Sequence, residues 1–412
     1  MKVNKNAIII IPGIMGSELF LGDNTNAPFE NDTPIWTASV FAEMQGIGDL
    51  SYIRNIFKSL RCNDDATSKY NVYTKRFTTK AELTAEEAEI YSNQCGTEDI
   101  YRNLFTTLNQ NNFLTSKYTI DFFSYDWRLS NGISAQKLDS YINEMGYDNV
   151  VLLGHSMGGL VASGYLALGE NQRNKVRAIY YLASPLLGSV EMVNVWMNEE
   201  LDALELELPV SSDILSIMFH IPGFSLRVLL SNFQSVYELI PTEKYFSLAN
   251  KNYLSYKSYL QTDSSEITYT TYSDSIEALQ RWYGISNTLM NNAESFHDSL
   301  YINGAHISSL VKSYYVYGNN YDTKSKMCHT TMYDIYGNIL LRFLPSAHTQ
   351  EGDKMVAKWS AALAGSYPNQ TYHVNAKHTP ITWNTDVKNF ITQNILGTYQ
   401  HNNSSITFIK GY

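Results

Sequence analysis

The stretch "VVLLGHSMGGL" at residues 150–160 runs from consecutive apolar residues into a serine that lies between two glycines. Apolar residues on successive positions are typical of a strand buried on both faces, and the small residues from Gly158 to Gly164 favour a closely packed helix. Gly154, Ser156 and Gly158 fit the pattern G-x-S-x-G, in which a tight strand-to-helix turn raises the serine hydroxyl above the sheet. A turn that merely contains a serine is the alternative.

The rest of the chain repeats this alternation of strand and helix. Apolar stretches that end in Gly, Pro or polar loops predict strands, and apolar residues at helical spacing predict the helices between them. The strands are expected at residues 6–14, 118–127, 149–154, 176–185, 313–318 and 371–375, and the helices at 97–113, 134–146, 158–170 and 381–396. This order predicts an α/β fold with a mostly parallel sheet and helices on both faces.

Two long connections interrupt this rhythm, at residues 22–95 and at residues 187–310. Insertions between strand and helix can cover a site at the carboxyl ends of the strands, so we expect one catalytic domain over residues 1–412 with both insertions above its site. Residues 214–240 are densely apolar. They could line an acyl groove, touch a bilayer surface or pack as a cap helix on the core.

Charge and composition exclude several classes of protein. The 412 residues include 30 Lys and Arg against 40 Asp and Glu, a net charge of −10 that argues against a nucleic-acid partner. No apolar run approaches the roughly 18 residues of a spanning helix, so no transmembrane segment is expected. The apolar run after the first lysines meets Pro12 and Gly13 and is interpreted as a strand, which favours a cytoplasmic location. A secreted protein whose leader has been removed is the alternative.

Cofactor chemistry is not required by the sequence. Cys62, Cys95 and Cys328 form no metal-spaced cluster, and no motif calls for a metal or an organic cofactor. Free thiols are the favoured interpretation, although Cys62 and Cys95 could pair in an exported protein.

A serine nucleophile needs a base, which is itself oriented by an acid. In this fold the order along the chain is serine, then acid, then histidine. His378, in "NAKHTPI", follows the last predicted strand and precedes a helix, so it is the expected base. Asp353 lies in a glycine-containing loop before it and is the expected acid, with Glu351 as the alternative. His373 lies within the apolar strand "TYHVN" and is expected to pack there.

The tetrahedral intermediate of acyl transfer also requires hydrogen-bond donors for its oxyanion. One is the N–H of the residue after the nucleophile, which is Met157 here, and the other comes from an early loop. The glycine-flanked turn in "IPGIMGSEL" after the first strand is suited to this role, with Met15 as the candidate donor. A plain strand-to-loop turn is the alternative interpretation.

These stretches resemble the lecithin:cholesterol acyltransferase family, which includes lysosomal phospholipase A2 and the phospholipid:diacylglycerol acyltransferases. The matching pieces follow the family's order from residue 8 to about residue 395. They are "IPGIMGS", "PIW", "YDWRLS", "GHSMGG", "ASPLLGS", "SVYELIP", "YYVYG", "EGDKMV" and the histidine at 378. The resemblance implies an α/β-hydrolase fold, with residues 22–95 as a lid and membrane-proximal insertion and residues 187–310 as a cap.

The resemblance also assigns roles to residues. It implies Ser156 as nucleophile, Asp353 as acid and His378 as base, with the oxyanion bound by two backbone N–H groups. These belong to the two candidate donors above, Met15 and Met157. Trp36 matches a lid-region tryptophan near the acyl site, or else simply packs in the core.

Other matched positions carry structural expectations. Asp126 and Arg128 of "YDWRLS" are expected to form a structural pair, because Asp126 precedes the serine and breaks the triad order. Lys354, Met355 and Val356 depart from the small residues that usually follow the family's acid. Cys62 and Cys95 do not match the lid disulfide of its extracellular members.

The function expected from this resemblance is hydrolysis or transfer of an acyl group from a lipid ester through an acyl-serine intermediate. The expected partner is a lipid or ester substrate, with peripheral membrane contact possible through the cap. A soluble carboxylesterase for small esters is one alternative. A non-catalytic ligand-binding homologue is the other, and it would be favoured only if a triad residue were missing.

Overall fold

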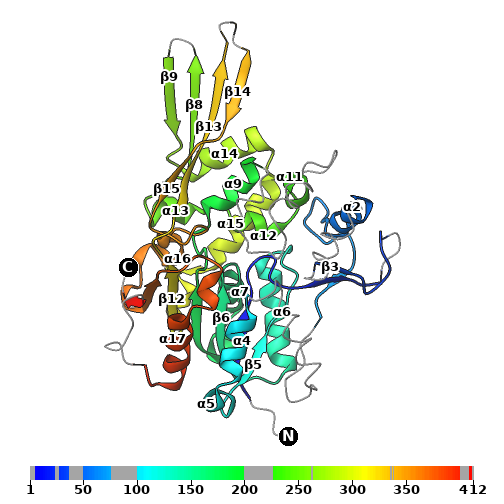
Figure 1. The fold of residues 1–412 in the computed structure, drawn as a ribbon, viewed down its shortest axis with the longest axis vertical. Coiled ribbons are helices and arrows are strands. Elements are labelled where there is room, and N and C mark those ends of the chain that lie inside the picture. Colours follow the sequence, from blue (N-terminus) through cyan, green and yellow to red (C-terminus); the bar gives the residue numbers. More distant parts are fainter. Residues whose placement is uncertain are drawn as a thin grey trace.

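In the computed structural model the chain folds around a seven-stranded sheet in the order β17-β16-β12-β7-β6-β1-β5 (Figure 1). The structure describes residues 5–23, 27–36, 50–75, 100–198, 226–260, 263–334, 336, 338–399 and 408–410. The strands are β1 (Asn6–Ile11), β5 (Thr119–Phe122), β6 (Asn149–His155), β7 (Val176–Leu182), β12 (Ser313–Gly318), β16 (Thr371–Val374) and β17 (Phe408–Lys410). The first six pair in parallel and β17 pairs antiparallel to β16, so the expected α/β class is confirmed.

Helices cover both faces of this sheet because its strands are apolar on successive positions. Side chains alternate between the faces of a strand, so Ile9 and Ile11 of β1 join one buried cluster while Ile8 and Ile10 join another. The first cluster includes residues of α6 (Asn131–Glu144) and α7 (Gly158–Ala167), and the second includes residues of α4 (Arg102–Asn109), α5 (Asn112–Thr115) and α17 (Thr385–Leu396). The short helix α8 (Glu170–Lys175) leads into β7.

Several expected strands end earlier in the structure than the sequence suggests. The first ends at Ile11 rather than residue 14, the second at Phe122 rather than 127, and the fourth at Leu182 rather than 185. Proline and glycine follow Ile11 directly, and proline offers no N–H to a neighbouring strand. The apolar residues beyond these ends therefore form loops at the carboxyl edge of the sheet, where the candidate site lies.

A second sheet projects from the body of the molecule, with β9, β8, β13 and β14 as its long strands (Figure 1). It comprises β8 (Leu254–Leu260), β9 (Asp263–Thr268), β13 (Thr323–Tyr333), β14 (Ile339–Phe343) and β15 (Ser346–Thr349). β8 pairs in parallel with β13, which lies beyond the central strand β12 in sequence. This second sheet was not predicted from the sequence, because the pairing of β8 with β13 joins segments that are distant along the chain.

The remaining helices between β7 and β12 pack beside this second sheet and the central one. They are α9 (Val190–Asn198), α11 (Leu226–Leu230), α12 (Gln234–Tyr237), α13 (Glu243–Ser247), α14 (Tyr272–Tyr283), α15 (Asn287–Ser299) and the 3₁₀ turn η3 (Ile307–Leu310), with the small hairpin β10 (Tyr301–Ile302) and β11 (Ala305–His306). A third sheet joins β2 (Leu19–Leu21), β3 (Pro34–Trp36) and β4 (Val72–Tyr73), with α2 (Leu50–Ser59) following β3. Near the end of the chain lie α16 (Lys358–Ala361), η4 (Leu363–Gly365), η5 (Pro368–Gln370) and η6 (Pro380–Thr382).

Parts of both expected insertions lie outside the described residues. These parts are residues 24–26, 37–49, 76–95, 199–225 and 261–262, so the domain boundaries stay predictions, as does any pairing of Cys62 with Cys95. The first part of the apolar stretch 214–240 lies outside as well. None of the helices in the described ranges has the length and apolar character that a bilayer crossing requires.

Candidate active site

Ser156 lies at the tip of the turn that joins β6 to α7. Its φ is 51°, in the left-handed region that a residue with a side chain adopts at a cost of about 1–2 kcal/mol. The glycines allow this turn to fit: a Cβ on Gly158 would lie 2.2 Å from the carbonyl oxygen of Ile11, and one on Gly154 would lie 2.8 Å from the nitrogen of Gly159. The serine is therefore held at the carboxyl edge of the sheet in a strained conformation, as such turns require.

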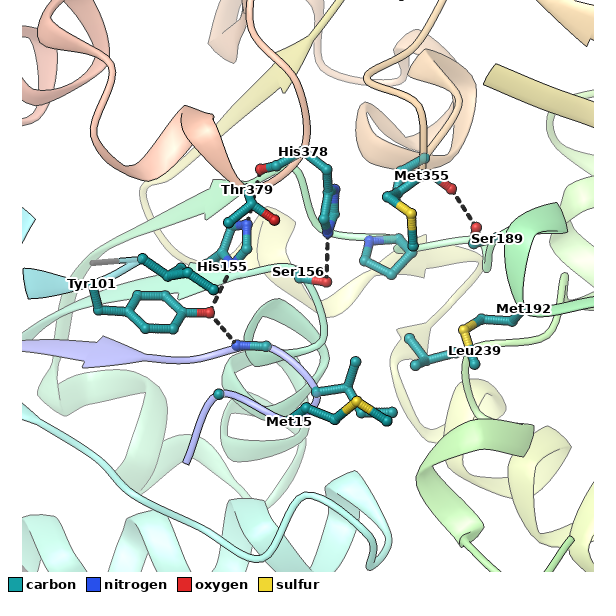
Figure 2. Close-up of a pocket in the computed structure, with 16 residues that line it drawn as sticks. Met15, Tyr101, His155, Ser156, Ser189, Met192, Leu239, Met355, His378 and Thr379 are labelled. Atoms are coloured by element: carbon teal, nitrogen blue, oxygen red, sulfur yellow. Dashed lines mark hydrogen bonds between the residues drawn. The ribbon is translucent and has the colours of Figure 1, made fainter. Parts of the chain in front are cut away.

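His378 and Asp353 meet Ser156 from loops that follow later strands. The Nε2 atom of His378 lies 2.9 Å from the Oγ of Ser156, and its Nδ1 atom lies 2.9 Å from the Oδ2 of Asp353 (Figure 2). All three side chains are buried. The structure thus brings the predicted nucleophile, base and acid into one hydrogen-bonded chain, with the histidine in the middle.

Asp353 is fixed by its own loop. Its Oδ1 accepts hydrogen bonds from the backbone N–H groups of Met355 at 3.0 Å and Val356 at 2.7 Å, and its carbonyl oxygen accepts one from His378 N–H at 2.9 Å. Glu351, the alternative acid, instead forms an ion pair with Lys358. The contacts therefore favour Asp353 over Glu351 as the partner of the histidine.

The loop after β1 brings Met15 to the same place. Gly16 N–H donates to Gly13 O at 3.1 Å, which closes a four-residue turn, and Met15 within it has a φ of 62°. Met157, the other expected donor, directly follows Ser156 and precedes the first residue of α7. Met15 lines the cavity in front of Ser156 (Figure 2).

Aromatic side chains hold this loop in its strained conformation. Trp36 Nε1 donates to the carbonyl oxygen of Met15 at 2.9 Å, the Tyr125 hydroxyl donates to that of Pro12 at 2.7 Å, and Trp127 Nε1 donates to that of Ser17 at 3.1 Å. Trp36 is not among the residues that line the cavity. Trp36 packs in the buried core, and its indole N–H bonds to the backbone of Met15, which lines the cavity, so a role of Trp36 at the acyl site stays a prediction.

Asp126 and Arg128 form the expected structural pair. Arg128 Nη2 lies 2.6 Å from Asp126 Oδ2 and Arg128 Nε lies 2.9 Å from Asp126 Oδ1, and both side chains are buried. Arg128 Nη1 also donates to the carbonyl oxygen of Leu60 at 2.8 Å. This two-point pairing anchors the segment that supplies Tyr125 and Trp127 to the loop of Met15, so the prediction of a structural pair is confirmed.

The cavity in front of Ser156 is mostly apolar, although Tyr101, His155, Ser189 and Thr379 line it together with the catalytic candidates. The cavity and the solvent-filled opening that leads into it together have a volume of about 610 Å³. Besides Ser156 and His378, its lining comprises Gly13, Ile14, Met15, Gly16, Ile100, Tyr101, His155, Pro185, Ser189, Met192, Leu239, Met355, Val356 and Thr379. Three of the lining residues are methionines, Met15, Met192 and Met355, and such side chains adapt to flexible apolar ligands. An acyl chain attached to an ester carbonyl fits this environment.

Two buried side chains next to the candidate triad, Tyr101 and His155, were not predicted from the sequence to belong to the site. His155 Nδ1 lies 2.7 Å from the hydroxyl of Tyr101, and burial lowers the pKa of His155 to about 3, with the neighbouring His378 as a further cause. Burial also raises the pKa of Tyr101. His155 stands at the first variable position of G-x-S-x-G, and Tyr101 begins a segment far from it in sequence, so only the first of the two offered a signal.

Metal binding finds no support in the described part of the chain, where no group of three or more His, Cys, Asp or Glu side chains could hold an ion.

The serine, histidine and carboxylate at the edge of a parallel sheet define an α/β-hydrolase. A family model described as lecithin:cholesterol acyltransferase matches residues 89–388, and the chain therefore belongs to this family. Its class of activity is that of an acyl-ester hydrolase or acyltransferase.

Individual proteins resemble this chain more weakly. A solved structure titled the Tle4-Tli4 complex contains a chain that is 14% identical, with a TM-score of 0.63, and the match covers 97% of this chain and 99% of that one. That likeness shows the fold alone. The mature lipase BlEst2 of Bacillus licheniformis matches 69% of this chain and 82% of its own, at 15% identity and a TM-score of 0.33.

One curated relative also matches. The uncharacterized protein YJR098C of Saccharomyces cerevisiae is 35% identical over 95 residues, which are 22% of this chain. The match spans only 13% of the yeast protein.

Proposed function

We propose that this protein cleaves acyl esters of lipids through an acyl-enzyme intermediate on Ser156. The observation that carries the proposal is the hydrogen-bonded chain from Ser156 through His378 to Asp353, which opens into an apolar cavity. Membership of the lecithin:cholesterol acyltransferase family supports the ester chemistry. The apolar lining supports a long acyl chain as the group that is bound.

The geometry accounts for the first half of the reaction. His378 Nε2 accepts the proton of the Ser156 hydroxyl while Oγ attacks the ester carbonyl carbon. The oxyanion that forms is stabilised by the backbone N–H groups of Met15 and Met157. Asp353 holds the imidazole through Nδ1 and stabilises its positive charge. Collapse of the intermediate breaks the ester C–O bond, and the leaving alcohol takes the proton from His378.

The second half releases the acyl group. Water or an alcohol gives its proton to His378 and attacks the acyl-serine carbonyl, and Ser156 regains its proton when the C–Oγ bond breaks. Water yields a free fatty acid, whereas an alcohol yields a new ester. Met192 and Leu239, both within residues 187–310, contribute to the cavity wall. Their position supports the proposal that this insertion caps the site.

The experiment that tests the proposal uses phospholipid vesicles with and without a long-chain alcohol, and the acyl products are identified by mass spectrometry. Ser156→Ala serves as the blank. We expect free fatty acid in water and, if the alcohol reaches the acyl-enzyme, a new alcohol ester. A panel of soluble esters of increasing chain length is the companion measurement. Turnover of short esters only, with no product from vesicles, would contradict the lipid assignment and favour a small-ester carboxylesterase.

A further inference from the structure

A buried chain of hydrogen bonds connects the loop of Met15 with the loop of His378. The backbone nitrogen of Gly13 lies 2.7 Å from the Tyr101 hydroxyl oxygen, which lies 2.7 Å from His155 Nδ1. His155 Nε2 lies 3.1 Å from the backbone carbonyl oxygen of His378. Figure 2 shows Tyr101 and His155 side by side next to Ser156, and both are almost completely buried.

The direction of each hydrogen bond in this chain is fixed by chemistry. A carbonyl oxygen only accepts, so His155 Nε2 must carry a proton and donate it to His378 O. A backbone N–H only donates, so the Tyr101 oxygen accepts from Gly13. The hydroxyl proton of Tyr101 then points to His155 Nδ1, which accepts through its lone pair when the ring is neutral. The arrangement requires one tautomer of a neutral His155.

The two ends of this chain of hydrogen bonds lie on the two sides of the proposed reaction centre. Gly13 packs directly against the nucleophile, because a Cβ on Gly13 would lie 2.8 Å from Ser156 Cβ and 3.3 Å from Ser156 Oγ. Gly13 also begins the turn that contains Met15, the proposed oxyanion donor. At the other end, the residue whose carbonyl accepts from His155 is the proposed base itself.

We propose that Tyr101 and His155 are positioning residues that fix the loop of the oxyanion donor relative to the loop of the general base. This inference rests on the proposed roles of Ser156 and His378. Neither side chain exchanges a proton with the substrate; each holds a backbone atom of a reacting loop. Rates fall steeply when reacting groups shift by about 1 Å, so the pair should act on turnover rather than on substrate binding.

The first test removes the hydroxyl of Tyr101. Tyr101→Phe keeps the ring and loses both hydrogen bonds, and we expect kcat on a soluble ester to fall about 10- to 100-fold while KM stays within about twofold. Tyr147→Phe is the matched control, because the Tyr147 hydroxyl is also buried and donates to Asp121 at 2.8 Å near the start of β6 rather than its end. Equal kcat losses in the two variants would overturn the proposal.

A double-mutant cycle separates a connected pair from two independent contributions. His155→Gln can keep the donor to His378 O while it loses the acceptor for Tyr101. If the two side chains act as one unit, the double variant with Tyr101→Phe loses no more activity than the less active of the two single variants. Additive losses would overturn the proposal.

The third test does not depend on activity or on the folding of a variant. In wild-type protein labelled with ¹⁵N-histidine, His155 should give a protonated Nε2 and an unprotonated Nδ1 signal that do not titrate near neutral pH. The opposite tautomer would overturn the proposal. If Ser156→Ala retained full turnover, the proposed function would fail instead, and these NMR signals would remain as they are.

Discussion

The carboxyl edge of the central sheet and the projecting sheet of β8, β9, β13 and β14 differ in how their side chains are held. At the carboxyl edge, Trp36, Tyr125 and Trp127 each donate a hydrogen bond to a backbone carbonyl of the loop after β1. On the projecting sheet, Leu341 is 53% exposed and Ile339 is 46% exposed. Buried side chains therefore hold the loop beside Ser156, whereas the projecting sheet leaves apolar side chains in solvent.

The two sheets also differ in how they are assembled. In the central sheet, consecutive strand–helix units place neighbouring strands side by side, as β6 and β7 show. In the projecting sheet, β8 pairs with β13 across a central strand and several helices. We therefore expect substitutions at the central edge to affect turnover and folding strongly, and those on the projecting sheet to have small effects.

The largest effect is expected at the nucleophile. Ser156→Ala should lower turnover by at least about 10⁴-fold, because no other hydroxyl replaces the attacking oxygen. The melting temperature should stay the same or rise, since the left-handed φ of Ser156 is a strained conformation that activity requires. Steady-state kinetics and thermal unfolding measure the two effects. Retained turnover would exclude Ser156 as nucleophile.

His378 and Asp353 provide the graded comparison within the same site. His378→Ala should approach the loss of Ser156→Ala, whereas Asp353→Ala should lose less, because an orienting acid contributes less than the base. Full activity of Asp353→Ala would assign the role to another carboxylate, with Glu351 the first to examine.

The next largest effect is on stability, and it is expected from a comparison of two ion pairs. One is buried at the central edge, and the other is partly exposed on the projecting sheet. Arg128→Met leaves the buried carboxylate of Asp126 without its ion-pair partner and should lower the free energy of unfolding by about 3–5 kcal/mol. Lys326→Met removes the partner of Glu266, a pair in which Lys326 is 24% and Glu266 44% exposed, and should cost less than about 1 kcal/mol. Chemical denaturation of both variants measures the difference. Similar losses would contradict the comparison.

A smaller, pH-dependent effect on stability is expected at Glu238, where the insertion of residues 187–310 meets α6. Burial raises the pKa of Glu238 to about 7, and its Oε2 accepts hydrogen bonds from the backbone N–H of Asn131 at 2.8 Å and from Asn131 Nδ2 at 2.7 Å. Because the folded state holds this proton more tightly than the unfolded state, stability is greatest below about pH 4.5 and declines as the pH rises toward 7.

Glu238→Gln tests this dependence because glutamine has a similar shape and does not ionise. A pKa raised from 4.5 to about 7 corresponds to about 3 kcal/mol of stability lost between a pH below 4.5 and a pH above 7. Unfolding of the wild type and of Glu238→Gln, measured from pH 4 to pH 8, should converge at low pH and diverge at high pH, with the variant the more stable. Parallel curves would show that the carboxyl group is ionised without penalty.

Much of the central fold and of the candidate triad could be predicted from local sequence. Buried strands are apolar on successive positions, so all six parallel strands were expected, and the glycines around Ser156 indicated the turn. The order of serine, acid and histidine then selected Asp353 and His378. The strands and the turn were accessible because each depends on a few neighbouring residues, and the acid and base because their order along the chain is fixed in this fold.

The missed features depend on contacts between distant segments. Tyr101 bonds to His155 across 54 positions of the chain, and no local pattern reveals such a pair. The hydrogen bond from Trp36 to the carbonyl oxygen of Met15 spans 21 positions and was likewise not indicated by any local pattern. The projecting sheet was not predicted, because it depends on the parallel pairing of β8 with β13, two segments that are distant along the chain.

The smallest effect is expected for an exposed apolar residue of the projecting sheet. Leu341→Thr keeps a residue suited to strands and should change the free energy of unfolding by less than about 0.5 kcal/mol, with unchanged turnover of soluble esters. Leu152→Thr in β6, a fully buried position, is the matched control and should lose about 2–4 kcal/mol. A large loss at Leu341 would show that this face is packed in solution. If vesicle turnover alone fell, the exposed face would be contacting the lipid surface, and the projecting sheet would belong to the reaction after all.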